Sequence, residues 1–320
     1  MSEPVRWGLL STARINNAIL EGAAPSERAE VVAVASRDRR RADEYARTHG
    51  IERPHGSYEA LLEDDDVEVV YVSLPNSLHV EWSLRALEAG KHVLCEKPLG
   101  RRVEHVERAF DAAERAGRLL MEAFMYRHHP QTKRTEDLVR DGAIGKLRQL
   151  RSLFSFTLTD DTNVRLLPEL DGGALMDLGC YCINMERLLA GEPELVFGRQ
   201  RLGATGVDVG FVAVLQFAGG VFGEFHCGFD LPDGIRLEAI GTQGTLVVRD
   251  PVRCRDPHVE LNGERIEVED VNRYFLEVEN FSAAVRGETE PLLGRADAVG
   301  QARVIEALYR SAASGAPVSL

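Results

Sequence analysis

Two short segments of the chain carry side chains that could move a proton. Lys97 lies in the tripeptide E-K-P, directly after a predicted strand over residues 92–95. Asp177 and Tyr181 are four residues apart in a predicted helix, so they share one helix face. A lysine charge beside a phenol favours the phenolate and brings its pKa down toward working pH, which suits acid–base catalysis. The alternatives are a surface lysine and a tyrosine whose hydroxyl is bonded in a core.

The first strand-to-helix turn is the natural phosphate site of an open α/β sheet. It reads G-L-L-S-T-A-R-I-N over residues 8–16 and lacks a full G-x-G-x-x-G motif. Ser11, Ala13 and Asn16 stand where the three glycines would fall. Small residues still let backbone N–H groups approach a pyrophosphate, and Ser11 and Thr12 add hydroxyl donors. An ordinary tight turn is the alternative interpretation.

A group of arginines follows the second predicted strand. This strand ends in Ser36-Arg37, and Arg39, Arg40 and Arg41 come directly after. Folds that bind NAD usually place an acidic residue here to hold the ribose hydroxyls. Serine and arginine suit a 2′-phosphate instead, because a guanidinium pairs with phosphate in a bidentate way. The pattern therefore favours NADP, with a solvated basic helix face as the alternative.

The first 125 residues alternate predicted strands with predicted helices. This order indicates βαβ units and a doubly wound parallel sheet. The loop over residues 75–79, P-N-S-L-H, follows the third long strand. Ligands of such sheets bind at the carboxyl ends of the strands, so this loop should meet a nucleotide, although a turn with a helix cap would look the same. The predicted strands cover residues 5–10, 31–35, 67–74, 92–95 and 119–124, and the predicted helices cover residues 14–22, 39–48, 58–63, 80–89 and 103–116.

The pattern changes near residue 125. Helices are predicted over residues 131–141, 174–189, 274–286 and 296–313. Between residues 195 and 268 the sequence predicts several strands joined by glycine-rich turns, which is typical of a mostly antiparallel sheet. We therefore expect an N-terminal Rossmann domain over residues 1–124 and a C-terminal α+β domain on a large open sheet over residues 125–320.

Composition excludes several classes of protein. The 320 residues include 38 Lys and Arg and 51 Asp and Glu, and the resulting charge of −13 disfavours nucleic acid as a partner. No signal-peptide pattern is present, and no apolar run reaches the roughly 20 residues that cross a bilayer, so no membrane partner is expected. Five scattered cysteines without a C-x-x-C pair predict a reduced, cytoplasmic protein. No His, Asp or Glu cluster has metal spacing, so proton transfer must fall to side chains.

Taken together, these segments resemble the glucose–fructose oxidoreductase, inositol dehydrogenase and rhizopine-catabolism family, abbreviated Gfo/Idh/MocA. The resemblance covers essentially the whole chain. It rests on S-T-A-R-I over residues 11–15, S-R at 36–37, the P-N-x-x-H loop, E-K-P, M-E-A-F-M-Y-R-H-H-P over residues 121–130 and G-G-A-L-M-D-x-G-C-Y over residues 172–181. The versions in this chain look most like the branch with NADP-dependent dimeric dihydrodiol dehydrogenases and D-xylose 1-dehydrogenases.

This resemblance implies hydride transfer at a nicotinamide, with Lys97 and Tyr181 as the central pair and Tyr181 as the proton carrier. It implies that Asp177 orients the sugar or the lysine, and that Arg37 and Arg41 hold the 2′-phosphate. It also implies subunits that associate through the open sheet, as a homodimer or homotetramer. One departure is Asp171, which replaces the first glycine of the family's usual G-G-G run.

The predicted site residues fall into three groups. The catalytic group is Lys97, Tyr181 and Asp177. The residues expected to contact NADP are Gly8, Ser11, Thr12, Ala13, Arg14, Ile15, Ser36, Arg37, Arg41, Leu74, Pro75, Asn76, His79, Glu96 and Lys97. Those expected to contact substrate are Lys97, Tyr126, Arg127, His128, Asp177 and Tyr181, where residues 126–128 lie in the crossover between the domains.

The expected activity is NADP(H)-dependent oxidation or reduction of a sugar or cyclic polyol at a CH–OH group. Two alternatives stay open. One is a ketoreductase of nucleotide-linked sugars, which needs a wider pocket. The other is a regulator that senses NADP without catalysis, although such a protein has no need of a proton carrier.

Overall fold

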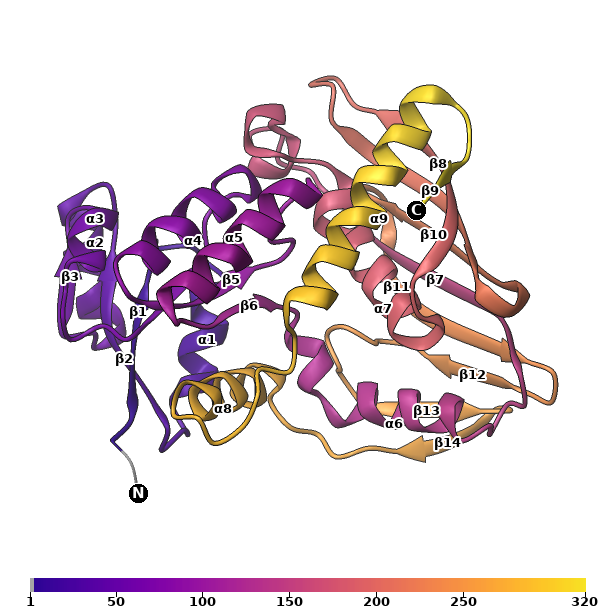
Figure 1. Cartoon of the computed structure of the whole chain (residues 1–320), viewed down its shortest axis with the longest axis horizontal. Coiled ribbons are helices and arrows are strands. Elements are labelled where there is room, and N and C mark those ends of the chain that lie inside the picture. The colour runs from indigo at the N-terminus through magenta and orange to yellow at the C-terminus, as the bar shows by residue number, and fades with distance from the viewer. Residues whose placement is uncertain (1–2) are drawn as a thin grey trace. The chain divides into compact units, whose positions relative to one another are not determined.

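A computed structural model describes residues 3–320 and divides the chain into two compact units (Figure 1). The first unit comprises residues 3–100, 104–125 and 271–298, and the second comprises residues 101–103, 126–270 and 299–320. The expected segments 1–124 and 125–320 therefore differ from these units in one main respect. Residues 271–298, expected in the C-terminal domain, pack with the first unit.

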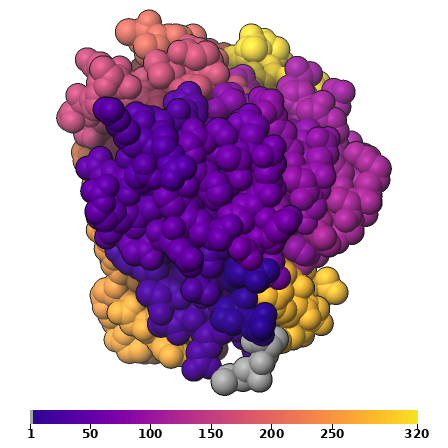
Figure 2. Space-filling model, turned by 90° about the vertical axis from the view of Figure 1, so that its left-hand side faces the viewer, coloured from indigo at the N-terminus to yellow at the C-terminus, as the bar shows by residue number. Residues whose placement is uncertain are grey.

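The first unit is built on a six-stranded parallel sheet in the order β3-β2-β1-β4-β5-β6. This is the strand order of a doubly wound dinucleotide-binding fold. Figure 1 shows helices on both faces of the sheet, and Figure 2 shows the unit from the side of β3, α2 and α3. Its elements are β1 (Val5–Leu9), α1 (Asn16–Ala23), β2 (Ala29–Ala35), α2 (Arg39–His49), β3 (Arg53–His55), α3 (Tyr58–Leu62), β4 (Val69–Val72), α4 (His79–Glu88), β5 (His92–Glu96), α5 (Val103–Ala116), β6 (Leu120–Ala123) and α8 (Arg273–Val285).

Helix α8 belongs to the first unit because its side chains complete that unit's core. Trp7 on β1 donates from Nε1 to the Ser282 hydroxyl at 3.2 Å and packs edge-on against Phe281. On α1, a Cβ at Gly22 would lie 2.7 Å from the backbone carbon of Tyr274, so only glycine allows the two helices to approach this closely. These contacts join residues 252 to 275 positions apart, which local sequence patterns do not reveal.

The second unit contains a nine-stranded sheet in the order β14-β13-β12-β11-β7-β10-β9-β8-β15. Only the pairing of β7 with β10 is parallel, so the sheet is mostly antiparallel as predicted. Its elements are α6 (Pro130–Arg140), β7 (Leu147–Thr157), α7 (Cys180–Ala190), β8 (Pro193–Leu202), β9 (Asp208–Phe217), β10 (Val221–Gly228), β11 (Asp230–Gly241), β12 (Thr245–Val248), β13 (His258–Leu261), β14 (Glu264–Glu267), α9 (Arg295–Ser314) and β15 (Val318–Ser319).

One face of this sheet is covered by helices, and the other face is exposed. Helices α7 and α9 lie against one face (Figure 1), and the strand residues that point toward them, such as Ala213, Leu215 and Phe225, are buried. The alternate residues Val212 and Val214 point to the other face and are 53% and 45% exposed. This strict alternation is the signature of a sheet with one packed face. Helix α6 lies beside the β12–β14 end.

Three features depart from the sequence-based expectations. The predicted helix over residues 174–189 begins with a π-helical turn, Leu175–Gly179, before α7. The short strand β3 was not predicted, because a three-residue strand leaves no periodic pattern. The first helix begins at Asn16 rather than at residue 14. No helix within residues 3–320 is long and apolar enough to cross a membrane.

Candidate functional site

The turn between β1 and α1 is fixed by hydrogen bonds within the protein. The Ser11 hydroxyl lies 2.8 Å from the Ser73 hydroxyl and accepts from Ala13 N at 3.0 Å. The buried side chain of Asn16 donates to the Ser11 carbonyl at 2.7 Å. The hydroxyl of Ser11 thus ties the turn to the end of β4, so its predicted contact with NADP would have to use the backbone.

Gly8 has a packing role that needs no cofactor. A Cβ at this position would lie 2.9 Å from Val67 Cγ1 and 3.1 Å from Leu61 Cδ2. The glycine therefore lets β1 pack against Leu61 of α3 and Val67 just before β4. Its predicted cofactor contact stays a prediction, as do those of Thr12, Arg14 and Ile15 in the turn.

The arginines after β2 divide into two kinds. Arg39 forms an ion pair with Asp43 at 2.8 Å on the surface of α2. Arg37 and Arg41 instead lie near the buried phenol of Tyr58. Burial raises the pKa of Tyr58, while the charge of Arg37, a hydrogen bond with it, and the charge of Arg41 oppose that rise. Two guanidinium groups therefore share one small region beside the carboxyl end of β2.

The neighbouring strand explains why Tyr58 joins these arginines. Ser36 N donates to the His55 carbonyl at 3.1 Å, which aligns the end of β2 with the end of β3. Ser57 then caps α3 by accepting from Ala60 N at 3.1 Å, so the chain turns directly after β3. Sequence reasoning missed Tyr58 because its proximity to the arginines depends on the undetected strand β3.

His79 connects two loops at the carboxyl edge of the sheet. It is 1% exposed, its Nε2 lies 2.7 Å from the Leu74 carbonyl, and its Nδ1 lies 2.8 Å from the Pro98 carbonyl. The imidazole therefore joins the loop after β4 to the loop after β5. Its ring therefore has a structural role, and its predicted contact with NADP stays a prediction. Pro75 and Asn76 in the same loop are partly exposed.

The loop that carries Lys97 is held at two further points. Glu96 accepts from the Tyr71 hydroxyl and from Lys97 N, the latter at 3.3 Å. Leu99 N donates to the buried carboxylate of Glu122 at 2.7 Å. The backbone on both sides of Lys97 is thus fixed by two carboxylates, the half-buried Glu96 and the buried Glu122, and the lysine residue is itself half-buried. Glu96, predicted to contact NADP, has a clear structural role in this frame.

In the second unit, the predicted substrate residues Tyr126 and Arg127 converge on one amide. The Tyr126 hydroxyl donates to Asn184 Oδ1 at 2.6 Å, and Arg127 donates to the same oxygen at 3.1 Å. Asn184 is fully buried on α7 and donates to Gln301 on α9 at 3.3 Å. Sequence reasoning did not single out Asn184, which looks like an ordinary helix residue.

The adjacent histidines have different environments. His129 is fully buried and caps α6 by accepting from Gln131 N at 3.0 Å, so its role is structural. Burial, together with the smaller effect of the charge of Arg127, lowers the pKa of His128 to about 3. His128 is therefore a neutral imidazole at physiological pH. Its predicted contact with substrate stays a prediction.

Asp177 and Tyr181 lie on the segment formed by the π-turn and α7. Asp177 accepts from Arg165 Nε at 2.6 Å, and Asn163 holds the backbone of Arg165 by accepting from its N–H at 3.1 Å. The Tyr181 ring packs between Phe154 and Tyr126, with centroid distances of 5.6 and 6.0 Å. These contacts orient both side chains.

The predicted catalytic residues are distributed over both units. Lys97 belongs to the first unit, and Asp177 and Tyr181 belong to the second. Their convergence at one reaction centre stays a prediction. Within residues 3–320, no group of three or more His, Cys, Asp or Glu side chains has the geometry of a metal site.

Comparisons with known protein families match both units. A model described as an oxidoreductase family with an NAD-binding Rossmann fold matches residues 7–124. A model of the GFO/IDH/MocA C-terminal domain matches residues 132–247. The chain is a member of the Gfo/Idh/MocA oxidoreductase family. The resemblance drawn from short motifs is therefore confirmed, and so is the expected fold class.

Several members of the family are similar over most of their length. D-xylose 1-dehydrogenase (NADP(+)) 2 of Haloferax volcanii is 37% identical, covering 98% of this chain and 99% of the relative. A trans-1,2-dihydrobenzene-1,2-diol dehydrogenase of Oryctolagus cuniculus is 39% identical over 77% of this chain and 74% of its own. The crystal structure of KijD10, a 3-ketoreductase from Actinomadura kijaniata in complex with NADP and TDP-benzene, is 33% identical with a TM-score of 0.91, covering 96% of this chain and 98% of that chain.

Proposed function

We propose that this family member is an NADP(H)-dependent oxidoreductase that acts on a CH–OH group of a sugar or cyclic polyol. The proposal is supported by a relative named as an NADP-dependent D-xylose dehydrogenase that matches 98% of the chain. The observation that carries it is Lys97, which follows β5 in a loop fixed by the buried groups His79 and Glu122. A fixed, half-buried cation at the carboxyl end of a parallel sheet suits the binding of a reacting oxygen.

Each proposed catalytic side chain has one task. In oxidation, NADP⁺ supplies the hydride acceptor. Tyr181 takes the proton of the substrate hydroxyl, and Lys97 binds the oxygen and favours the ionised phenol. Asp177, oriented by Arg165, holds a neighbouring hydroxyl of the sugar or the lysine. In reduction the proton moves from Tyr181 to the carbonyl oxygen.

The arrangement around β2 fits the 2′-phosphate of NADP(H). Arg37 and Arg41 gather at Tyr58 rather than at acidic partners, in contrast to Arg39. We propose that their guanidinium groups bind the phosphate and that the Tyr58 hydroxyl helps to orient Arg37. NADP would then be preferred over NAD.

A ketoreductase of nucleotide-linked sugars is the second candidate. It is favoured by the 3-ketoreductase structure with TDP-benzene, which superposes on 96% of this chain. Both candidates use the same proposed side chains and differ in the substrate. Proposed contacts to the substrate come from Tyr126, Arg127 and His128 besides the catalytic three.

A substrate screen at 340 nm tests the proposal. The purified chain is assayed with NADP⁺ and NAD⁺ against D-xylose, other aldoses, levoglucosan and trans-dihydrodiols, and with NADPH against TDP-linked keto sugars. Steady turnover with NADP⁺ on a sugar or polyol supports the first candidate. Turnover on keto sugars alone supports the second. Binding of NADPH without turnover on any of them would favour a regulator that senses NADP and contradict the proposed enzyme.

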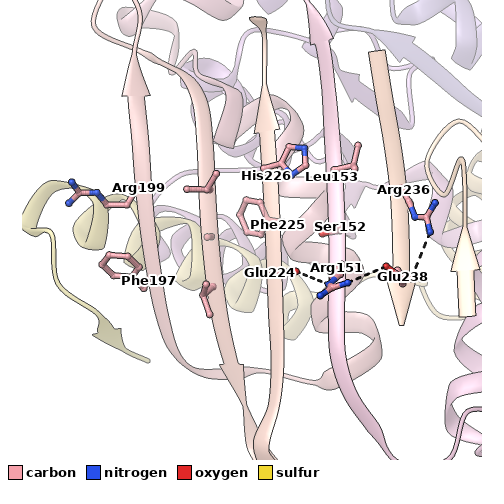
Figure 3. Close-up of a pocket in the computed structure, with 13 residues that line it drawn as sticks. Arg151, Ser152, Leu153, Phe197, Arg199, Glu224, Phe225, His226, Arg236 and Glu238 are labelled. Carbon is pink, nitrogen blue, oxygen red and sulfur yellow. Dashed lines mark ion pairs between the residues drawn. The ribbon is translucent and has the colours of Figure 1, made fainter. Parts of the chain in front are cut away.

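We also propose that the chain forms a homo-oligomer through the open face of the nine-stranded sheet. An open hollow of about 530 Å³ lies on this face (Figure 3). Arg151 on β7 extends between Glu224 on β10 and Glu238 on β11, at 2.7 and 4.0 Å, and the exposed valines lie on β9, the next strand beyond β10. A face that combines apolar side chains with charges of both signs is self-complementary, as a two-fold interface requires.

Sedimentation analysis of Val214→Glu tests this interface. We expect the wild type to sediment as a dimer or tetramer and the variant to shift toward the monomer, because a buried carboxylate would lack a partner. Leu292→Glu is the control, since Leu292 is 47% exposed but lies in the first unit. A monomeric wild type would contradict the proposal. A cytoplasmic location is proposed as well, since all five cysteines are buried thiols without disulfides.

A further inference from the structure

The segment that carries Asp177 and Tyr181 begins with an irregular backbone. Asp171 has φ 53° and ψ 43°, and Gly173 has φ 128°, so both lie outside the conformations that most residues prefer. The π-turn Leu175–Gly179 follows at once, and Cys180 N donates to the Leu175 carbonyl five residues back. A change of pitch in one helical turn rotates all the residues that follow it. The directions of the Asp177 and Tyr181 side chains therefore depend on the contacts that fix the backbone at the beginning of this segment.

Asp208, the first residue of β9, fixes the backbone at the beginning of the π-turn through a hydrogen bond to Leu175 N. It is 3% exposed, accepts from Leu175 N at 2.7 Å and accepts from the Tyr309 hydroxyl at 2.9 Å. Burial raises the pKa of Asp208 to about 6, and the hydrogen bonds from Leu175 N and Tyr309 oppose that rise. At pH 7.5 the carboxylate is therefore ionised and is a strong acceptor for the orphan N–H at the beginning of the helical segment.

The backbone of the turn touches the same carboxylate. A Cβ at Gly173 would lie 2.2 Å from Asp208 Oδ1 and 3.2 Å from the Tyr309 hydroxyl oxygen. Only glycine fits between these groups. The close contact fixes the position of the turn as well as its hydrogen bond.

Arg101 contacts both Tyr309 and the beginning of the Asp177–Tyr181 segment. Its guanidinium lies 3.9 Å from the centroid of the Tyr309 ring, and it forms an ion pair with Asp171 at 3.6 Å. Nearby, Val103 N donates to Glu306 on α9 at 3.0 Å. Arg101 is four residues beyond Lys97 in the sequence. Arg101 and Val103, which belong to the second unit, are thus attached to the same helix, α9, that supplies Tyr309.

We propose that Asp208, Tyr309 and Arg101 form a positioning cluster that fixes the start of the Asp177–Tyr181 segment and thereby aligns Tyr181 for proton transfer. The proposal rests on the proposed function for its effect on catalysis. None of the three residues is proposed to touch substrate or cofactor. A misplacement of about 1 Å in a reacting group can cost on the order of 100-fold in rate, so such a cluster has kinetic consequences.

Two measurements on Asp208→Asn test the cluster at pH 7.5. Hydrogen exchange of the amides in residues 172–181 should be about fivefold faster or more, because the charged acceptor of Leu175 N is lost. With a sugar substrate and NADP⁺, kcat should fall about tenfold while the KM for NADP⁺ stays within about twofold. Tyr309→Phe keeps the ring under Arg101 and should show the same pattern at smaller amplitude. Asp256→Asn is the control, because Asp256 is exposed and pairs with Arg265.

The outcomes separate the cluster from the proposed function. Unchanged exchange in both Asp208→Asn and Tyr309→Phe would overturn the cluster, whether or not the wild type turns over a sugar. Faster exchange with unchanged kcat in an active enzyme would also overturn it, since the turn would then not align Tyr181. Faster exchange spread over the whole unit, with a large loss of thermal stability, would indicate a general structural role and contradict the proposal. A wild type without turnover contradicts the proposed function, and the exchange result still decides whether the cluster anchors the turn.

Discussion

Lys97 and Tyr181 are held in place by two different strategies. The Lys97 loop is fixed by groups at the ends of adjacent parallel strands: Tyr71 on β4, His79 after it and Glu122 on β6. All of these contacts join residues 19 to 25 positions apart. A parallel sheet brings such strand ends to one edge by construction, so the frame forms as soon as the sheet does.

Tyr181 depends on partners from much farther along the chain. Gln301 on α9 donates to the Cys180 carbonyl at 2.7 Å across 121 residues, and Asp208 holds Leu175 across 33 residues. These contacts require the antiparallel sheet and the C-terminal helix to be in place. The comparison indicates that the lysine site is robust to distant substitutions, whereas the tyrosine site is sensitive to them.

The largest expected effect comes from Lys97→Met. Methionine has a similar volume but no charge, so the reacting oxygen would lose its cation and the phenol its electrostatic support. We expect kcat with a sugar substrate to fall at least about 100-fold, since positioned acid–base groups contribute roughly that much or more. NADPH binding, followed by fluorescence, should stay within about threefold.

Lys133→Met is the matched control for this variant. Lys133 is 72% exposed and pairs with Asp137 on the surface of α6. Near-normal kcat in Lys97→Met would show that the lysine takes no part in the reaction. The difference between the contacts that fix the Lys97 loop and those that fix the Tyr181 segment would then have no bearing on catalysis.

A smaller effect is expected for the arginines that surround Tyr58. In Arg37→Ala the 2′-phosphate loses a charge-assisted hydrogen bond, which is worth about 1.5–3 kcal/mol or roughly 10- to 100-fold in affinity. The KM for NADP⁺ should rise by about that factor, while the KM for NAD⁺ changes little. Arg39→Ala should leave both unchanged because Arg39 pairs with Asp43.

Kinetics with the two cofactors provide the measurement. Equal effects of Arg37→Ala and Arg39→Ala would show that the division of the arginines has no functional meaning. Tyr58→Phe should produce an intermediate change, since it removes the hydroxyl but leaves both guanidinium groups in place.

The sequence predicted the strand order of the first unit, and with it the loops that share one edge of the sheet, better than it predicted the surroundings of Asp177 and Tyr181 in the second unit. The loops after β1, β2, β4 and β5 were placed correctly because the βαβ order alone puts them at one edge. The order of strands and helices does not reveal in which direction the side chains of these loops point. The Ser11 hydroxyl bonds to Ser73 and the His79 ring to backbone carbonyls, and the predicted contacts of both residues with NADP stay predictions.

In the second unit, the helix with Asp177 and Tyr181 was predicted but its frame was not. Asp208 stands at the start of a strand and Tyr309 in the middle of a helix, and neither belongs to a motif. The π-turn is also invisible in the sequence, because an extra residue in one turn leaves the apolar pattern of a helix almost unchanged. Long-range contacts of this kind are specified by packing rather than by local preference.

The smallest expected effect concerns Glu186, which is buried on α7 under the covered face of the sheet. Its Oε1 accepts from the Ser152 hydroxyl at 2.7 Å, and a Cβ at Gly223 would lie 2.1 Å from Oε2. Burial raises the pKa of Glu186 to about 8, with Ser152 opposing and the charge of Glu224 adding to the rise. The folded protein therefore keeps a proton that the unfolded chain, with a carboxyl pKa of about 4.3, releases.

This difference sets the direction of a pH effect on stability. The folded state binds more protons than the unfolded state between about pH 4.3 and 8, so the contribution of Glu186 to stability is fully present below that window and is lost as the pH rises through it. Glu186→Gln stays neutral at every pH. We expect its Tm to match that of the wild type near pH 4.5 and to exceed it by a few degrees at pH 8, with the gap widening steadily between. Glu264→Gln, at an exposed site on β14, should show no such trend. Parallel melting curves for Glu186→Gln and the wild type across this range would mean that the carboxylate is accommodated in the core, and that the covered face of the sheet is less sensitive to charge than the structure indicates.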